Sequence, residues 1–365
     1  MAAGSRKNKS QANDAWYTEK GKDEDVVLST KVRLSRNLAN FPFPEYEKGQ
    51  QVDRVLSIIY DVFNHLDDAE RFQSIKVSDL DNLGQKILEE RGVLQTLDGQ
   101  NPGLVIRNDG KVSCQINSRD HIRISSYKTG FDPESTFKES KDLDNLMQTK
   151  VQFAASWDFG YLTSCLDEAG SGMKLSSLFH LPGISLEGKI WSFMQKCRER
   201  GYILSSTYGA GKQGMSLGSY YTITNLNSLS GSEEEQIAAF YNYGKEVIEM
   251  EKTARKECEY NKMSLIKDMV YRAFALAKYS LFMPVRESVE VISNIKLGKD
   301  LNLLNGIDDN ILNALLYRIQ DGHLEYVLKN GDFDFPGDIA EDSVKKNERL
   351  RCLILQEAVE KVSVV

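Results

Sequence analysis

The sequence is poor in the residues that build metal and disulfide sites. It has four histidines and five cysteines in 365 residues. The cysteines, at positions 114, 165, 197, 258 and 352, are widely spaced and form no CxxC pair. This pattern argues against a disulfide framework or a metal centre and predicts reduced thiols in the cytoplasm. No apolar run approaches the roughly 18 residues of a membrane-spanning helix, and the polar start lacks the apolar core of a signal peptide.

An excess of positive charge is also missing. The formal net charge is −7, which argues against a broad nucleic-acid-binding surface but is compatible with a local basic pocket for a phosphorylated ligand. Hydrophobic residues make up 41% and charged residues 27% of the chain, as in ordinary globular proteins.

Hydrophobic periodicity predicts an α+β fold in two parts. We expect a flexible polar tail over residues 1–24, a mixed antiparallel domain over about 25–254, and an all-helical domain over about 255–365. Alternation predicts strands at 27–34, 103–109, 111–118, 120–128, 202–209 and 219–226, with a further strand entering a loop at 157–167. Helical spacing predicts helices at 51–66, 136–156, 186–201 and 232–281, the last with an N-cap at Ser232.

Basic residues recur on the predicted strands. Lys31 and Arg33 share one strand face, which indicates an anionic ligand such as a polyphosphate, although a solvated strand face is the plainer interpretation. Arg119, His121 and Arg123 alternate in a second segment, where His121 taken alone is more typical of a structural histidine. The glycine-rich turn from Gly209 is not a Walker motif, because the required GK[ST] spacing is absent.

Three segments, taken in order, resemble one family. These are VLSTKVRLSRNLANFPFP, QINSRDHIRI and GYLTSCLDEAGSGMKLSSLFHLPG. Together they resemble the signatures of the ATP:guanido phosphotransferases, or phosphagen kinases, over roughly residues 25–228. The HLPG ending, the missing large helical N-terminal domain and NIKLGKDLNLLNGI are similar to the bacterial protein-arginine kinase branch. This resemblance implies a glutamine-synthetase-like antiparallel sheet flanked by helices, with a helical C-terminal domain.

The resemblance also implies a reaction and its residues. The family transfers the γ-phosphoryl group of Mg-ATP to a guanidinium nitrogen, with arginines holding the phosphates. Matched positions imply nucleotide-binding roles for Ser29, Thr30, Lys31, Val32, Arg33, Arg91, Arg123 and Lys174, and an active-site role for Cys165. Glu348 and Arg351 fall on the branch's phosphoarginine pocket, although an ordinary charged helix is the alternative. Mg²⁺ would arrive with the nucleotide, so no separate metal site is implied.

Several positions depart from the family pattern. Lys31 and Lys174 stand where the family has phosphate-binding arginines, and Ser205 stands where its R-G-x-x-G-E motif has an arginine. Arg119 and Ala210 stand where it has its two catalytic glutamates, and Ser118 replaces a neighbouring glutamate. A cation at position 119 would repel the incoming guanidinium.

Three functions therefore stay open. The first is an active protein-arginine kinase, with Asp167 or Glu168 supplying a carboxylate. The second is a catalytically degenerate kinase that regulates a stress-response or Clp-type proteolysis system by binding a protein partner. The third is a kinase for an anionic acceptor, attracted by Arg119. A protein substrate or regulatory partner is expected, without nucleic acid or membrane, and a homodimer stays open.

Overall fold

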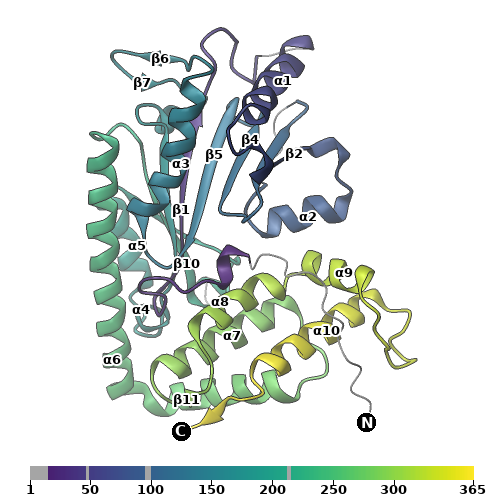
Figure 1. Cartoon of the computed structure of the whole chain (residues 1–365). Coiled ribbons are helices and arrows are strands. Elements are labelled where there is room, and N and C mark those ends of the chain that lie inside the picture. The colour runs from purple at the N-terminus through teal and green to yellow at the C-terminus, as the bar shows by residue number, and fades with distance from the viewer. Residues whose placement is uncertain (1–14, 47–48, 95–99, 212–214) are drawn as a thin grey trace.

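A computed structural model describes residues 15–46, 49–94, 100–211 and 215–365 of the chain (Figure 1). Residues 1–14 of the predicted tail and positions 212–214 of the glycine-rich turn lie outside these ranges. Among the helices in the described ranges, none combines the length and the apolar character needed to cross a bilayer.

One large sheet dominates the first part of the chain. Its strands are β1 (Val27–Arg36), β2 (Phe72–Lys76), β3 (Gly103–Arg107), β4 (Val112–Ile116), β5 (Ile122–Thr129), β8 (Met173–His180), β9 (Tyr202–Ser206) and β10 (Tyr220–Asn225). They are all antiparallel in the order β2-β3-β4-β5-β1-β8-β10-β9, so β1 lies inside the sheet. Two small sheets pair β6 (Ala155–Ser156) with β7 (Gly160–Tyr161), and β11 (Leu304–Asn305) with β12 (Ser363–Val364).

Helices flank this sheet and form the second part of the chain (Figure 1). They are α1 (Gln50–Asn64), α2 (Asn82–Glu90), α3 (Pro133–Gln148), α4 (Pro182–Leu186), α5 (Ile190–Glu199), α6 (Glu233–Tyr279), α7 (Val285–Asp300), α8 (Asp309–Arg318), α9 (Asp321–Asn330) and α10 (Ser343–Ala358). The predicted fold class, an antiparallel sheet with flanking helices followed by a helical C-terminal part, is confirmed.

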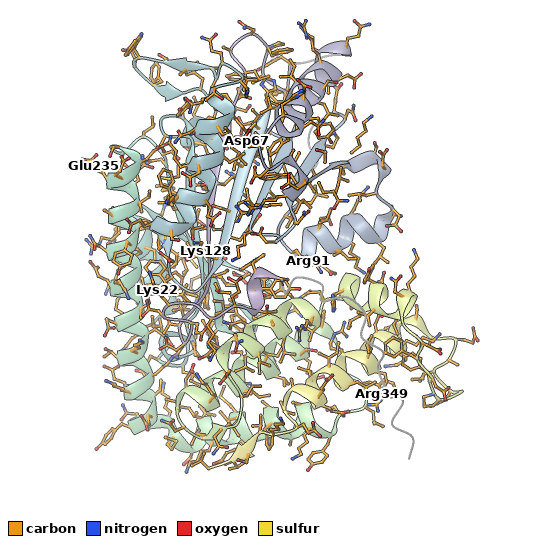
Figure 2. The ribbon with its side chains drawn as sticks, in the orientation of Figure 1. Lys22, Asp67, Arg91, Lys128, Glu235 and Arg349 are labelled. Atoms are coloured by element: carbon orange, nitrogen blue, oxygen red, sulfur yellow. The ribbon has the colours of Figure 1, made fainter. Side chains whose placement is uncertain are left out.

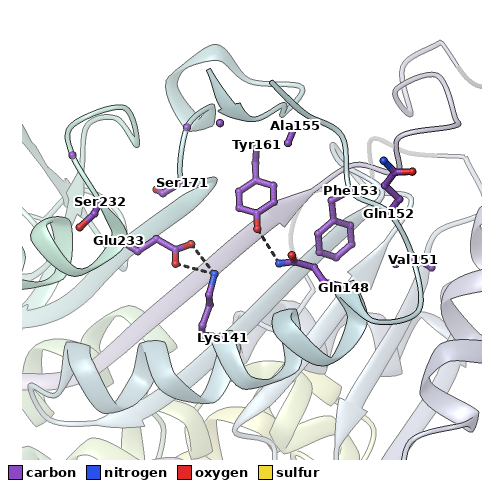
Figure 3. Close-up of a pocket in the computed structure, with 13 residues that line it drawn as sticks. Lys141, Gln148, Val151, Gln152, Phe153, Ala155, Tyr161, Ser171, Ser232 and Glu233 are labelled. Carbon is purple, nitrogen blue, oxygen red and sulfur yellow. Dashed lines mark hydrogen bonds and ion pairs between the residues drawn. The ribbon is translucent and has the colours of Figure 1, made fainter. Parts of the chain in front are cut away.

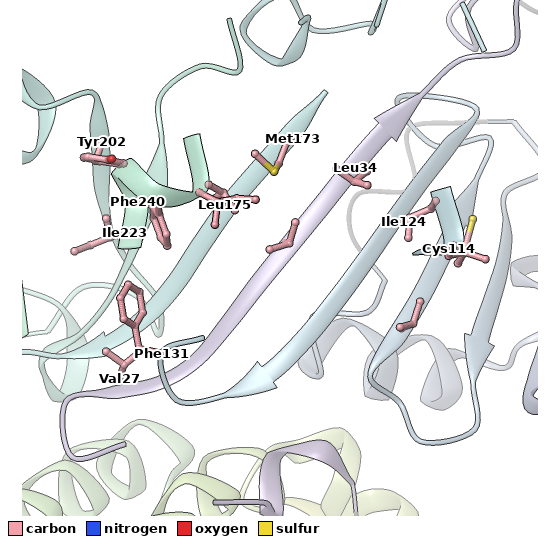
Figure 4. Close-up of a cluster of buried hydrophobic side chains, with 14 of the residues drawn as sticks. Val27, Leu34, Cys114, Ile124, Phe131, Met173, Leu175, Tyr202, Ile223 and Phe240 are labelled. Carbon is pink, nitrogen blue, oxygen red and sulfur yellow. The ribbon is translucent and has the colours of Figure 1, made fainter. Parts of the chain in front are cut away.

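The alternation along β1 gives the sheet two different faces. Val32 and Leu34 point into a hydrophobic cluster that also contains residues of α1, α3, α5 and α6. Figure 4 shows Leu34 of β1 beside Ile124 of β5 and Met173 of β8 in this cluster. The intervening residues Lys31 and Arg33 therefore point to the opposite face of the sheet.

The long helix α6 joins the two parts. It begins with a capping box, in which Ser232 and Glu235 each bond the other's backbone N–H, as the sequence predicts for its start. It continues through position 254, the predicted end of the first domain, and leaves helical geometry only at Lys262. Ala254 belongs to the core of the sheet, whereas Cys258 belongs to the core of the helical part. The core thus changes within a continuous stretch of α6 that precedes the kink at Lys262. The two domain limits stay predictions.

Two local expectations differ from the structure. The helix predicted over 136–156 ends at Gln148, because the backbone beyond it pairs with the segment after β1, where Ala154 N–H donates to Asn37 O at 2.7 Å. Of the strand predicted over 157–167, only Gly160–Tyr161 is a strand.

The described end of the predicted polar tail is packed against the protein. Trp16 and Tyr17 are buried, and the Trp16 ring stacks on Tyr127 of β5 with centroids 5.6 Å apart. Tyr17 stacks on Tyr317 of α8 at 4.3 Å. Burial of two aromatic rings outweighs the polarity of the surrounding residues and orders this segment.

Candidate functional site

Four cations converge on the face of the sheet opposite the hydrophobic cluster. Lys31 and Arg33 come from β1, Arg123 from β5 and Lys174 from β8. In the sheet register, Arg33 lies directly opposite Lys174, and Arg123 lies opposite Ser35. Directly opposite residues in antiparallel strands share a face, so the pairing of three strands brings these charges together. We call these four residues the cationic cluster.

A carboxylate enters the cationic cluster from a loop. Glu168 ends a short 3₁₀ turn, Leu166–Glu168, that directly follows Cys165. Its side chain is 7% exposed and pairs with the Arg33 guanidinium. It lies 3.5 Å from Arg123 Nη2 and accepts a hydrogen bond from Ser35 Oγ at 3.1 Å. The sequence offered Glu168 as a replacement catalytic carboxylate, but its oxygens are directed to the cations.

The electrostatic balance keeps Glu168 ionised. Burial alone would raise the pKa of Glu168, but the charges of Arg33, Arg123 and Lys174 outweigh burial and hold it below the ordinary value. Asp120 Oδ2 lies 3.3 Å from Arg123 Nε. Four cations less the two carboxylates of Glu168 and Asp120 leave two positive charges. That surplus suits a ligand with several negative charges, such as a polyphosphate.

The lysines of the cationic cluster are half-buried and close to other cations. Burial lowers the pKa of Lys31, and the charges of Arg33 and Arg123 lower it further. Lys31 Nζ donates to Gly92 O at 3.1 Å and lies 4.8 Å from the centre of the Tyr127 ring. Burial also lowers the pKa of Lys174, although Glu168 partly opposes this. An added anion would stabilise the charged form of both lysines.

Cys165 lies beside the cationic cluster. It is half-buried, whereas the other four cysteines are buried. Cys165 is close enough to Lys174 to act on the pKa of that lysine, which burial nevertheless lowers. Its carbonyl accepts from Thr163 Oγ1 at 2.7 Å, which holds the backbone before the turn. The thiol is thus partly accessible and lies next to a lysine, and its active-site role stays a prediction.

The other residues predicted to bind the nucleotide do not all lie on the sheet face that carries the cationic cluster. Thr30 and Val32 are fully buried and point away from the cationic cluster, and Thr30 Oγ1 donates to Gly130 O at 2.7 Å. Ser29 shares the face of Lys31 and Arg33. Arg91 caps the end of α2, on the side of α9 (Figure 2), and precedes the Gly92 carbonyl that Lys31 contacts. Their nucleotide-binding roles stay predictions.

Arg119 and Ala210, the two positions that the sequence matches to the family's catalytic glutamates, both lie within the described residues. Arg119 is exposed in the turn between β4 and β5. The pKa of Arg123 is lowered mainly by burial, and the charges of Arg33 and Arg119 lower it further. Ala210 is exposed, and its carbonyl accepts from Arg286 Nη2 at 2.5 Å. His121 is structural, since its Nδ1 accepts from Leu38 N–H at 3.0 Å and burial lowers its pKa to about 4.

The residues of the predicted phosphoarginine pocket bond to other groups of this chain. Arg351 is 1% exposed, and its guanidinium donates to Ile319 O and Met283 O, both at 2.8 Å, and to the Asp321 carboxylate. Glu348 pairs with Lys345, one turn earlier on α10, at 2.7 Å. A ligand at Arg351 would have to replace these bonds. Its role as a pocket residue stays a prediction.

A cavity of about 590 Å³ lies between α3, β7 and the start of α6 (Figure 3). Lys141 and Glu233 form an ion pair at 2.8 Å on its wall, and Gln148 Nε2 donates to the Tyr161 hydroxyl at 2.8 Å. Gly170 and Ser171, shortly after Glu168 in the chain, also line it. Sequence reasoning missed this cavity, because its lining comes from three distant segments without a common motif.

Two family models match the chain. The model described as "ATP:guanido phosphotransferase, C-terminal catalytic domain" matches residues 54–254. The model described as "Protein-arginine kinase McsB C-terminal domain" matches residues 263–362. The first match alone covers more than half of the chain.

Relatives and solved structures agree with these matches. The protein-arginine kinase of Syntrophomonas wolfei subsp. wolfei is 27% identical over 318 residues, which are 85% of this chain and 88% of that protein. That of Bacillus velezensis is 28% identical over 314 residues, 85% of this chain and 86% of that protein.

Two solved structures share the fold. The duplicated taurocyamine kinase from Schistosoma mansoni aligns with a TM-score of 0.57 and 22% identity, over 62% of this chain and 33% of that chain. Lombricine kinase aligns with a TM-score of 0.56 and 18% identity, over 66% and 70%. This chain therefore spans a third of the duplicated kinase, and at these identities both structures show the fold alone.

Proposed function

The chain belongs to the ATP:guanido phosphotransferase family, and from this premise we propose that it keeps a polyphosphate site but does not phosphorylate arginine. In this proposal it is a protein-binding regulator of a stress-response or Clp-type proteolysis system. The observation that carries the proposal is the charge at the acceptor positions, where Arg119 and Ala210 replace two glutamates. The ligand would be ATP, with Mg²⁺ bound through its phosphates.

The argument from charge is direct. An acceptor guanidinium is a cation, so its approach to the γ-phosphate depends on carboxylates that attract it, align it and take up its proton. Loss of one such base costs about 10²–10⁴ in rate. Arg119 adds repulsion to that loss, and Glu168, the buried carboxylate of the cationic cluster, pairs with Arg33 and Arg123.

A second candidate is an active protein-arginine kinase. It is favoured by the half-buried Cys165 thiol next to Lys174, which is the arrangement that orients a guanidinium in the family, and by the cationic cluster itself. The named relatives at 27% and 28% identity are protein-arginine kinases. The two candidates predict opposite results in one assay.

That assay incubates the purified full chain with γ-labelled Mg-ATP and casein, followed by a search for acid-labile label on arginine. We expect none above the level of a Cys165→Ala control. Acid-labile label that disappears in Cys165→Ala would establish the kinase and sink the proposal.

Nucleotide binding is measured separately by thermal shift with Mg-ATP. Ligand at 100 times its Kd adds about 2.7 kcal/mol to the free energy of unfolding. An unchanged melting temperature at millimolar Mg-ATP would contradict the retained polyphosphate site.

A further inference from the structure

The Glu168 carboxylate has the surroundings of a bound phosphate oxygen. It contacts the guanidinium groups of Arg33 and Arg123 and the hydroxyl of Ser35, all on the face where the cationic cluster gathers. Guanidinium groups bind carboxylates and phosphates with the same planar set of donors. A polyphosphate that entered the cationic cluster would therefore bind the same hydrogen-bond donors that Glu168 already occupies.

The position of Glu168 in the chain allows its carboxylate to leave. Glu168 belongs to a loop turn and not to the sheet, and the preceding Leu166 is 84% exposed. The turn is held through its backbone, where Ser228 N–H donates to Asp167 O at 2.9 Å. Rotation about the side-chain bonds of Glu168 would thus free the arginines without unpairing any strand.

We propose that Glu168 is a tethered competitor of the ligand's phosphate chain, which must displace this carboxylate from Arg33 and Arg123 in order to bind. Glu168 then determines how tightly the site holds polyphosphate. It also stabilises the ligand-free protein, because it separates two buried guanidinium groups that repel each other. The inference rests on the polyphosphate site of the proposed function, but not on the loss of phosphoryl transfer.

The test is calorimetric titration of the full chain with ADP and, separately, with inorganic tripolyphosphate. Glu168→Gln keeps the shape of the side chain and removes its charge, so we expect it to bind both ligands about tenfold more tightly than the unchanged protein. Ser35→Ala retains every charge and removes one hydrogen bond to Glu168, so we expect a smaller gain. Asp167→Asn is the matched control, since it removes one exposed negative charge from the same turn and should change affinity less than about twofold.

Each outcome decides the inference. A folded Glu168→Gln variant that binds no better than the unchanged protein overturns it, as does an equal gain in Asp167→Asn. A gain for ADP without one for tripolyphosphate also overturns it, because the competition would then not concern phosphates. If Glu168→Gln does not fold, an unchanged affinity in Ser35→Ala overturns it. If neither the unchanged protein nor any variant binds the two ligands, both the inference and the retained polyphosphate site are overturned. Labelled arginine in casein would contradict only the proposal that the protein does not phosphorylate arginine.

Discussion

At the level of single residues, Glu168 compensates the cationic cluster in the ligand-free protein. The pKa of Glu168 lies below its ordinary value, because nearby cations outweigh its burial. A carboxylate of this kind stabilises the folded state fully above its unfolded pKa of about 4.3, and the stabilisation is lost as the pH falls through the folded value.

Because the pKa of Glu168 is lowered in the folded protein, the loss of stability caused by Glu168→Gln should depend on pH. At neutral pH the variant leaves two buried guanidinium groups without their shared partner, which should lower the free energy of unfolding by about 3–5 kcal/mol. Below about pH 4 the difference from the unchanged protein should shrink, because the Glu168 carboxyl becomes protonated first in the unfolded state and then, at lower pH, in the folded state. Urea unfolding at a series of pH values measures it. A difference that stays constant down to pH 3 would contradict an ionised Glu168.

A second prediction concerns the acceptor positions. The double variant Arg119→Glu, Ala210→Glu places carboxylates where the family has its catalytic glutamates, and it should gain acid-labile label on casein by about 10²-fold or more. The matched control is Arg119→Gln, Ala210→Gln, which has side chains of the same size without the charge. Equal labelling by the two double variants would show that these positions do not limit transfer.

At the level of elements, a glycine allows α6 to approach the sheet. A Cβ atom on Gly244 would lie 2.0 Å from the Phe131 ring. Gly244→Ala should therefore destabilise the protein by about 1–3 kcal/mol, although alanine favours helix by about 1 kcal/mol. Thermal unfolding measures the change. Gly84→Ala in α2 is the control, since its nearest neighbours lie at 3.1 Å or more, and it should be neutral or slightly stabilising. Stabilisation by Gly244→Ala would refute the close packing.

The same scale shows which parts of the fold could be predicted from the sequence. The alternation of β1 and the capping signal of α6 are recognisable in the sequence because each is local. β8 was not recognised as a strand, although it carries Lys174. Its Ser176 and Ser177 interrupt the apolar alternation, and the buried Ser177 is accommodated only because its hydroxyl meets Thr30 Oγ1 at 3.2 Å across the strands. A hydrogen bond between residues so far apart leaves no sign in either segment.

The candidate site was predictable to a similar extent. The motifs indicated Arg33, Arg123 and Lys174, and the strand register brings them together. The position of the Glu168 side chain could not be predicted, because a turn does not fix the direction of its side chains. Its neighbour Asp167 carries the same charge but is exposed.

At the scale of the whole molecule, Arg255 links the sheet to the helical part. Its guanidinium lies 2.9 Å from Asp300 of α7 and 2.7 Å from Glu251, and it donates to His180 O at 3.1 Å. Glu251 in turn accepts from the Gly183 and Ile184 N–H groups at the start of α4. One buried arginine thus contacts both parts.

Arg255→Met should therefore destabilise the protein by about 3–5 kcal/mol, because the buried Glu251 carboxylate loses its guanidinium partner and Asp300 loses one of its cationic partners. Urea unfolding followed by circular dichroism measures this change. Arg272→Met, at an exposed pair with Asp268, is the control and should change stability by less than about 1 kcal/mol. Equal effects of the two substitutions would rule out the linking role.

The packing of Trp16 has a practical consequence. Of the three tryptophans, Trp157 and Trp191 are 103% and 59% exposed, whereas Trp16 is 5% exposed. An aqueous quencher should therefore reduce the fluorescence of Trp157 and Trp191 and leave that of Trp16 nearly unchanged. The surviving emission comes from an indole stacked on Tyr127, the ring beneath Lys31. The protein thus contains its own optical probe of whether an anion has reached the lysine end of the sheet.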